Sequence, residues 1–159
     1  SRMLEGLDRN DSLNILDLFD EHLFSIEEGT PCKEDLLADM CRSVAERVSA
    51  SENPLPLILA REELADTSLN DDFAIPHPIR PCFSQTGVSV RLMRNPLHWS
   101  DAHHGVRIVF LLYIQPGDVG NIEPLFNLLV KIGDNAELRR ELMECTDFAG
   151  FRRVLAQAL

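Results

Sequence analysis

The sequence predicts an α/β domain of three layers, in which helices cover both faces of a central β-sheet. Three apolar or β-branched runs in the middle of the chain, residues 73–76, 88–93 and 106–114, are bounded by Pro, Gly or Asn and are typical of strands. Segments with apolar residues at helical spacing precede and follow these runs. Because strands flanked on both sides by helices pack as a sheet between helical layers, we expect a three-layer sandwich.

Length and charge narrow the possible functions. The chain of 159 residues is long enough for one domain with a proper core, and 45% of its residues are hydrophobic. The formal net charge is −11, from 26 acidic and 15 basic residues. Such a surface repels phosphate backbones and anionic lipids, so we expect no direct nucleic-acid binding by this domain.

The lack of a membrane-spanning or leader segment and the spacing of the cysteines predict a cytoplasmic protein. The longest clean apolar run, residues 108–114, is too short to cross a bilayer, and the N-terminus lacks a basic-then-apolar leader. We therefore expect no membrane insertion. The four cysteines are widely scattered with no CxxC spacing, which predicts free thiols in a reducing cytoplasm.

The first part of the chain divides into a tail and the start of the domain. Residues 1–12 are polar and without period, so we interpret them as a linker or tail preceding a domain at 13–159. This abrupt opening indicates a piece of a longer chain. The segment "LNILDLFDEHL" predicts a helix whose inward side carries Leu13, Leu16 and Phe19, and residues 22–26 predict a short strand.

A long amphipathic helix follows. Thr30 and Pro31 are typical of a helix start, because a hydroxyl caps the first turn and proline needs no N–H there. The helical spacing is carried by Leu36, Leu37, Met40, Cys41, Val44 and Val48. The segment "SASENPLP" breaks this helix, and a short second helix is predicted over residues 57–64.

The C-terminal third is predicted to be helical. The run 106–114 is apolar almost throughout, which fits a central strand buried on both faces, and residues 115–121 predict a loop. Three helical patterns follow, and Thr146 or Asp147 would cap the last. Their apolar positions are Leu125, Leu128, Leu129 and Ile132; Leu138, Leu142 and Met143; and Phe148, Phe151, Val154, Leu155 and Ala158.

The stretch "FAIPHPIR" contains the candidate for chemistry. Two prolines flank His77 and stiffen its backbone, so the imidazole should project at the end of a strand. Neutral imidazole is a nucleophile for phosphorus, and Arg61 supplies a forked guanidinium for phosphoryl oxygens. From the spacing alone, a structural His77 in a turn and an Arg61 paired with Glu62 or Glu63 remain the alternative.

A family resemblance favours the chemical interpretation. The segment "AREELADTSLNDDFAIPHP", residues 60–78, resembles the active-site block of the mannitol/fructose-type IIA domain of the phosphoenolpyruvate-dependent sugar phosphotransferase system. The block has an Arg-Glu pair, a threonine and leucine, a turn, and then Ala-Ile/Val-Pro-His. The rest of residues 13–159 resembles the family in the order and length of its predicted elements.

The resemblance implies a phosphohistidine carrier on an α/β sandwich whose sheet is mixed. His77 would accept a phosphoryl group from the phosphocarrier HPr and could pass it to a IIB or IIB-like domain. Arg61 would stabilise the charge, and Thr67 would support the phosphate site. We expect no cofactor and no metal.

Two positions depart from the family's pattern. Pro78 stands where the family usually has glycine after the histidine. Transport-type members carry a second histidine after the central strand, and alignment places Asn121 there. Because an asparagine can donate a hydrogen bond but cannot carry a proton or a charge, this difference favours a sensor over a high-flux carrier.

Three roles follow from the resemblance. Our first interpretation is the regulatory IIA-like domain of a bacterial sugar-operon transcription regulator or antiterminator, whose other domains would be its partners. The second is a sugar-transport IIA component, a phosphotransferase-type carrier from HPr to IIB. The third is an interaction module that is not phosphorylated. The sequence leaves open the sugar, the direction of regulation, the oligomeric state and the imidazole nitrogen that reacts.

The segment "HWSDAHH" offers a second cluster of polar side chains. His98, Asp101, His103 and His104 are residue types that suit zinc or nickel. No helical face brings them together, and the segment joins two predicted strands. We therefore interpret it as a solvated loop, assign no metal site, and expect Trp99 to serve packing.

Overall fold

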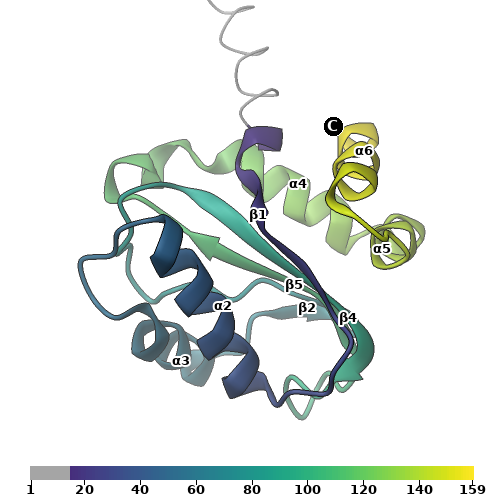
Figure 1. Cartoon of the computed structure of the whole chain (residues 1–159), viewed down its shortest axis with the longest axis horizontal. Coiled ribbons are helices and arrows are strands. Elements are labelled where there is room, and N and C mark those ends of the chain that lie inside the picture. Colours follow the sequence, from purple (N-terminus) through teal and green to yellow (C-terminus); the bar gives the residue numbers. More distant parts are fainter. Residues whose placement is uncertain (1–14) are drawn as a thin grey trace, which may run out of the picture.

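The computed structural model describes residues 15–159 and shows one five-stranded sheet with helices on both faces (Figure 1). The predicted α/β sandwich with a mixed sheet is confirmed. The elements in chain order are β1 (Phe19–Glu27), α2 (Lys33–Arg47), α3 (Pro54–Leu64), β2 (Ser68–Asn70), β3 (Phe73–Ala74), β4 (Gly87–Leu97), β5 (Val106–Tyr113), the 3₁₀ helix η1 (Pro116–Asn121), α4 (Glu123–Gly133), α5 (Ala136–Met143) and α6 (Phe148–Ala158).

The sheet has the strand order β1-β4-β5-β3-β2. β5 lies in the centre, antiparallel to β4 and parallel to β3, whereas β1 is parallel to β4 and β2 is antiparallel to β3. The side chains of β5 are buried on both faces except at Arg107, which confirms the predicted central strand. Because β3 and β5 are parallel, their C-terminal ends lie at the same end of the sheet.

Two hydrophobic clusters, one on each face, hold the layers together. α2 and α3 cover one face and pack through Leu37, Met40 and Ile58, while α4, α5 and α6 cover the other through residues such as Leu129 and Phe151 (Figure 1). Burial of these fully enclosed side chains contributes about 1.5–3 kcal/mol each to folding, before the cost of conformational entropy. None of the helices in residues 15–159 has the length and apolar character that crossing a bilayer requires.

The helices predicted after residue 30 are confirmed, and two of them start at other residues than predicted. α2 begins at Lys33 and not at Thr30-Pro31, and its N-cap is Cys32, which makes no side-chain hydrogen bond there. α3 begins at Pro54, three residues before the predicted start, because Asn53 caps it by accepting from the Leu55 N–H. Asp147 caps α6 by accepting from the Gly150 N–H. Side-chain caps therefore mark the starts of α3 and α6, whereas α2 starts without one.

The helix predicted from Leu13 onward is wrong from Phe19, where β1 begins. Leu13 lies outside the described residues, and the strand predicted over residues 22–26 falls inside β1. Within β1 the buried residues Phe19 and Leu23 belong to different hydrophobic clusters, on opposite faces of the sheet. The pairing with β4 is irregular between Phe19 and Phe24, so the regular alternation that predicts a strand is broken. Pairing with β4 determines the outcome, with Phe19 opposite Val88.

Two further elements differ from the predictions. β2 was missed, because it has three residues at the sheet edge and its Leu69 is 47% exposed, so it shows no apolar alternation. The predicted loop 115–121 contains η1. The four cysteines are free thiols, as predicted.

A buried arginine closes the C-terminal end of α4. Arg139 of α5 is 9% exposed, and its Nε donates to Asp72 Oδ1 at 2.6 Å. Its Nη1 donates to the carbonyls of Ile132 and Gly133 at 3.0 and 2.6 Å. The Ile132 carbonyl also accepts from the Asn135 N–H at 3.3 Å, and the Gly133 carbonyl accepts from Asn70 Nδ2 at 2.9 Å. Arg139 therefore adds a charged donor to carbonyls at the end of a helix, where its positive charge is also favourable for the helix dipole.

Candidate functional site

His77 lies just beyond the C-terminal end of β3, in backbone that is held on both sides. The carbonyl of Pro76 accepts from the Leu112 N–H of β5 at 2.9 Å. Two residues after His77, the Ile79 N–H donates to the Leu57 carbonyl of α3 at 3.0 Å. The backbone around His77 therefore joins the central strand to α3.

The His77 imidazole is partly exposed, and its hydrogen bond defines its tautomer. Nδ1 lies 2.9 Å from the Ile75 carbonyl oxygen. Because a carbonyl oxygen can only accept, Nδ1 carries the proton and donates it. In the neutral ring Nε2 then holds the lone pair, and in the described part of the chain Nε2 has no hydrogen-bond partner. The arrangement leaves Nε2 as the ring nitrogen with a free lone pair.

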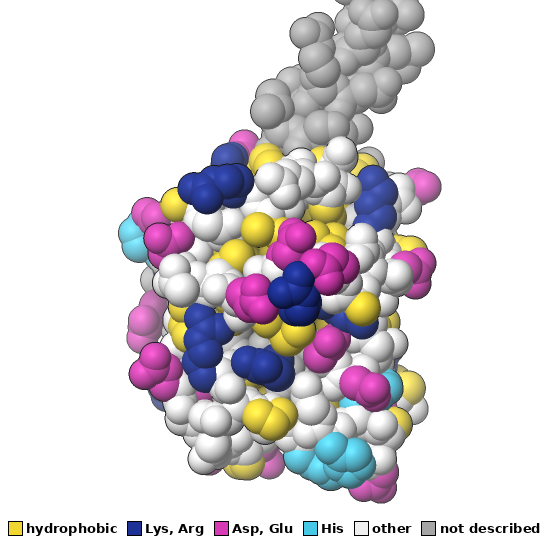
Figure 2. Space-filling model, turned by 90° about the vertical axis from the view of Figure 1, so that its right-hand side faces the viewer, with side chains coloured by type: hydrophobic (Ala, Val, Ile, Leu, Met, Phe, Trp, Pro, Cys, Tyr) yellow, Lys and Arg dark blue, Asp and Glu magenta, His cyan; other side chains and the backbone are white. Residues whose placement is uncertain are grey.

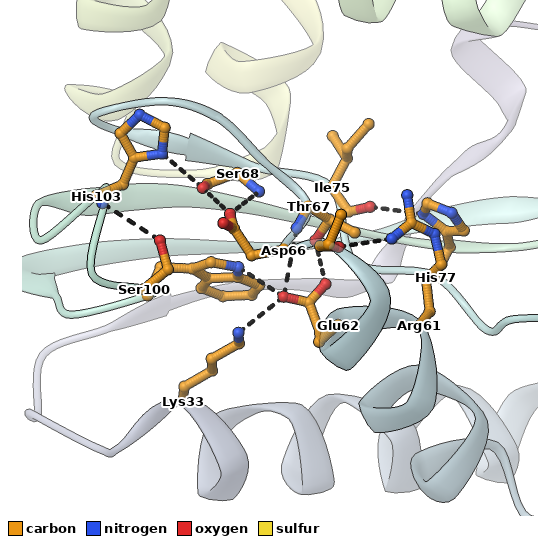
Figure 3. A network of polar contacts seen from close by, with 12 residues as sticks. Lys33, Arg61, Glu62, Asp66, Thr67, Ser68, Ile75, His77, Ser100 and His103 are labelled. Carbon is orange, nitrogen blue, oxygen red and sulfur yellow. Dashed lines mark hydrogen bonds and ion pairs between the residues drawn. The ribbon is translucent and has the colours of Figure 1, made fainter.

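Arg61 brings a guanidinium to the same end of the polar network as His77 (Figure 3). It follows Leu57 by one helical turn of α3, and Leu57 is the residue that bonds the backbone after His77. Nη1 of Arg61 donates to the Ala65 carbonyl at 2.6 Å. A guanidinium has five N–H donors, so this bond orients Arg61 and leaves other donors that an anion could use.

Thr67 is buried, and it positions the backbone leading to His77. Its hydroxyl donates to Glu62 Oε2, and its backbone N–H lies 3.4 Å from Glu62 Oε1. Its carbonyl accepts from the Ile75 N–H at 3.0 Å. Thr67 therefore ties α3 to the strand segment before the histidine.

Glu62 is the centre of a network that sequence reasoning missed (Figure 3). Its side chain is only 5% exposed, and besides Thr67 it contacts Lys33 Nζ at 2.8 Å and Trp99 Nε1 at 2.8 Å. The ammonium of Lys33 also lies 4.7 Å from the centre of the Trp99 ring. The Arg-Glu pair at 61–62 was the available signal, but nothing in the local pattern shows that the carboxylate is buried.

Asn121 lies apart from these residues in its contacts. It is exposed at the end of η1. Because η1 follows β5, it starts at the same end of the sheet as His77. It lines a separate hollow together with Thr86 and Asp118. Thr86 Oγ1 donates to Asp118 Oδ2 at 2.7 Å and accepts from the Gln115 N–H at 2.9 Å. The role predicted for Asn121 stays a prediction.

The histidine-rich loop contains contacts that the sequence did not indicate. His103 Nδ1 lies 2.6 Å from Ser68 Oγ, and the rings of His98 and His104 are in contact. Within residues 15–159, no three or more His, Cys, Asp or Glu side chains converge as metal ligands. Trp99 is 3% exposed, so its predicted packing role is confirmed, and its indole N–H adds the bond to Glu62.

Comparison with known families decides the classification. Residues 17–158 match the family model for the phosphoenolpyruvate-dependent sugar phosphotransferase system, EIIA 2. The chain belongs to this family. The predicted resemblance is thus confirmed over almost the whole described chain.

Curated relatives are longer than this EIIA 2 chain. It is 24% identical over 139 residues, 87% of its length, to the probable licABCH operon regulator of Bacillus subtilis. It is 28% identical over 104 residues, 63% of its length, to the 2-O-alpha-mannosyl-D-glycerate-specific EIIABC component of Escherichia coli. The chain spans 21% and 16% of these two relatives.

Solved structures share the fold. The nitrogen regulatory protein IIA-Ntr of Neisseria meningitidis superposes with a TM-score of 0.74 at 20% identity, covering 89% of this chain and 98% of that one. Enzyme IIAMtl of E. coli, solved in complex with phosphorylated IIBMtl, superposes with a TM-score of 0.71 at 17% identity, covering 87% and 99%. The EIIA 2 fold is therefore present from β1 to α6.

Proposed function

We propose that His77 accepts a phosphoryl group on Nε2 from the phosphohistidine of HPr, and that Arg61 stabilises the transferred charge. The observation that carries the proposal is the hydrogen bond from Nδ1–H to the Ile75 carbonyl at 2.9 Å. It leaves the lone pair of Nε2 on a partly exposed ring, held at the end of the sheet by the backbone bonds of Pro76 and Ile79.

The transfer balances without another reactant. The Nε2 lone pair attacks phosphorus, the N–P bond of the donor histidine breaks, and the donor imidazole recovers the electron pair. The Ile75 carbonyl then stabilises the N–H of the ring that carries the phosphoryl group. Phosphoryl transfer depends mainly on positioning and on charge stabilisation, which the remaining N–H donors of Arg61 supply.

The role that we propose is regulatory. The probable licABCH operon regulator matches 87% of this chain, and the chain spans about a fifth of that relative, which leaves room for further domains. In such a protein the phosphorylated His77 would report the state of sugar uptake to the other domains. The phosphoryl group adds about −1.5 to −2 charges, enough to change a domain contact on a chain of net charge −11. We place this domain in the cytoplasm, together with HPr.

A transport role is the second candidate, supported by the similarity to an EIIABC component. In that role the phosphoryl group would pass from His77 to a IIB domain, as the solved complex of IIAMtl with phosphorylated IIBMtl suggests. The domain order of the parent polypeptide separates the two roles. DNA-binding or PTS-regulation domains support the regulator, and fused IIB and membrane domains support the transporter.

The test of the phosphoryl site is incubation with phosphoenolpyruvate, enzyme I and HPr. Wild type should gain an acid-labile phosphoryl group, His77→Ala should gain none, and the exposed His22→Ala should label like wild type. Arg61→Ala should slow labelling by about 10²-fold or more, because a charge-stabilising donor is lost. The phosphocarrier proposal fails if neither wild type nor any variant is labelled, or if His77→Ala is labelled like wild type. A complete absence of labelling would support the third role, an interaction module that is not phosphorylated.

A further inference from the structure

Two imidazoles meet in the loop between β4 and β5. Nδ1 of His98 and Nδ1 of His104 lie 2.7 Å apart, and the ring centres are 4.5 Å apart with planes inclined by 59°. Both side chains are exposed, and Figure 2 shows histidine side chains gathered in a patch on the surface. Six residues separate the two histidines in sequence, so the loop geometry creates this contact.

The protonation of this pair follows from its partners. Nε2 of His104 lies 3.0 Å from the Asp101 carbonyl oxygen, which can only accept, so Nε2 carries the proton. In a neutral ring Nδ1 of His104 is then a lone pair. It faces Nδ1 of His98 at 2.7 Å. Without a metal, a neutral His98 ring satisfies this contact by donating its Nδ1–H to the lone pair of His104. When His98 carries its proton on Nε2 instead, two lone pairs face each other, and a metal ion can take the place of the proton.

We propose that His98 and His104 bind one divalent transition-metal ion of borderline softness, such as Ni²⁺, through their Nδ1 atoms. Metal–nitrogen bonds of about 2.0–2.1 Å place neighbouring ligands about 2.9 Å apart at a right angle and about 3.3 Å apart in a tetrahedron. The observed 2.7 Å is closer to the right-angle arrangement of octahedral or square-planar ions. Small ring rotations then aim both lone pairs at one point.

A second observation supports His104 as a ligand. Histidines that bind metals nearly always donate their other ring N–H to a carbonyl or carboxylate, which orients the ring. The bond from His104 Nε2 to the Asp101 carbonyl is such a contact. The charge of −11 on the chain also favours cation binding. Since no third protein ligand converges there within residues 15–159, water completes the coordination and the site exchanges its ion readily.

The proposed metal site is independent of the phosphoryl site. The loop 98–105 leads into β5, whereas His77 follows β3, a strand parallel to β5. The two sites therefore lie at opposite ends of the sheet. Figure 3 agrees, since His103 of the same loop and His77 occupy opposite sides of the polar network. Loss of His77 should leave metal binding unchanged.

Calorimetric titration of the tag-free protein with Ni²⁺ at about pH 7.5 tests the site. We expect one equivalent bound with a micromolar dissociation constant, weakened at least about tenfold in His98→Ala and in His104→Ala. The exposed His22→Ala and Cys32→Ser are matched controls and should bind like wild type. Binding should also weaken at about pH 5.5, since an imidazolium cannot ligate a metal.

A measurement on the unmodified protein guards against a variant that fails to fold. Long-range ¹H–¹⁵N spectra of the imidazole rings with Zn²⁺, a diamagnetic probe, should show two histidines that bind the ion through Nδ1 and carry their proton on Nε2. The proposal is overturned if wild type shows no stoichiometric Ni²⁺ binding, if both single variants bind like wild type, or if Zn²⁺ binds through Nε2 or through a single ring.

Discussion

Replacing Glu62 by alanine tests how strongly the buried polar network holds α3 to the sheet. The carboxylate is 5% exposed and accepts from Lys33 and Trp99, each at 2.8 Å, and from Thr67. Removing one partner of a buried ion pair costs about 3–5 kcal/mol, and leaving a buried donor unpaired costs about 1–3 kcal/mol. Lys33 is 23% exposed and can regain water, so we expect a loss near the lower end, about 3 kcal/mol of unfolding free energy.

Urea unfolding followed by the fluorescence of Trp99, the only tryptophan, measures this loss. Glu62→Gln keeps the shape and one acceptor but turns an amide donor toward Lys33 or Trp99, so its loss should be intermediate. Glu63→Ala changes the adjacent exposed carboxylate, which makes no hydrogen bond or ion pair within residues 15–159, and should stay within about 0.5 kcal/mol of wild type. A loss below about 1 kcal/mol in Glu62→Ala would refute the reasoning.

Three further outcomes are expected. Arg139→Ala removes the buried guanidinium that closes α4, and urea unfolding should show a loss of about 3–5 kcal/mol, whereas a surface-like loss would contradict its structural role. The hydrogen bond from Arg91 holds the pKa of Asp39 below 3.8, so this carboxylate stabilises the fold above about pH 4 and loses that effect as the pH falls through its folded pKa. Asp39→Asn should therefore flatten the decline of stability between about pH 5 and pH 3, and an unchanged decline would count against the ion pair. Burial raises the pKa of Cys41 to about 12, so iodoacetamide at about pH 8 should modify the exposed Cys32 well before Cys41, as peptide mass spectrometry can show; equal rates in the native protein would disprove the protection.

Helices and the central strand were predictable because their signals are local. In α2 and α4 apolar residues recur at the helical period, and in β5 an unbroken apolar run matches burial on both faces. β1 was not predictable in the same way, because a register shift between Phe19 and Phe24 places Phe19 and Leu23 on opposite faces and breaks the two-residue alternation. Pairing with β4 makes this segment a strand.

The candidate site also combines features that local sequence predicts with features that only the folded chain determines. Local pattern was sufficient to single out His77, with its two prolines, and Arg61, within a block that matches the family. The sequence pattern could not predict the tautomer of His77, the burial of Glu62 or the contact between His98 and His104. Each depends on which backbone carbonyl or side chain the folded chain brings to a given atom. Strand order, register and loop geometry set those distances, and they come from packing between residues far apart in the chain.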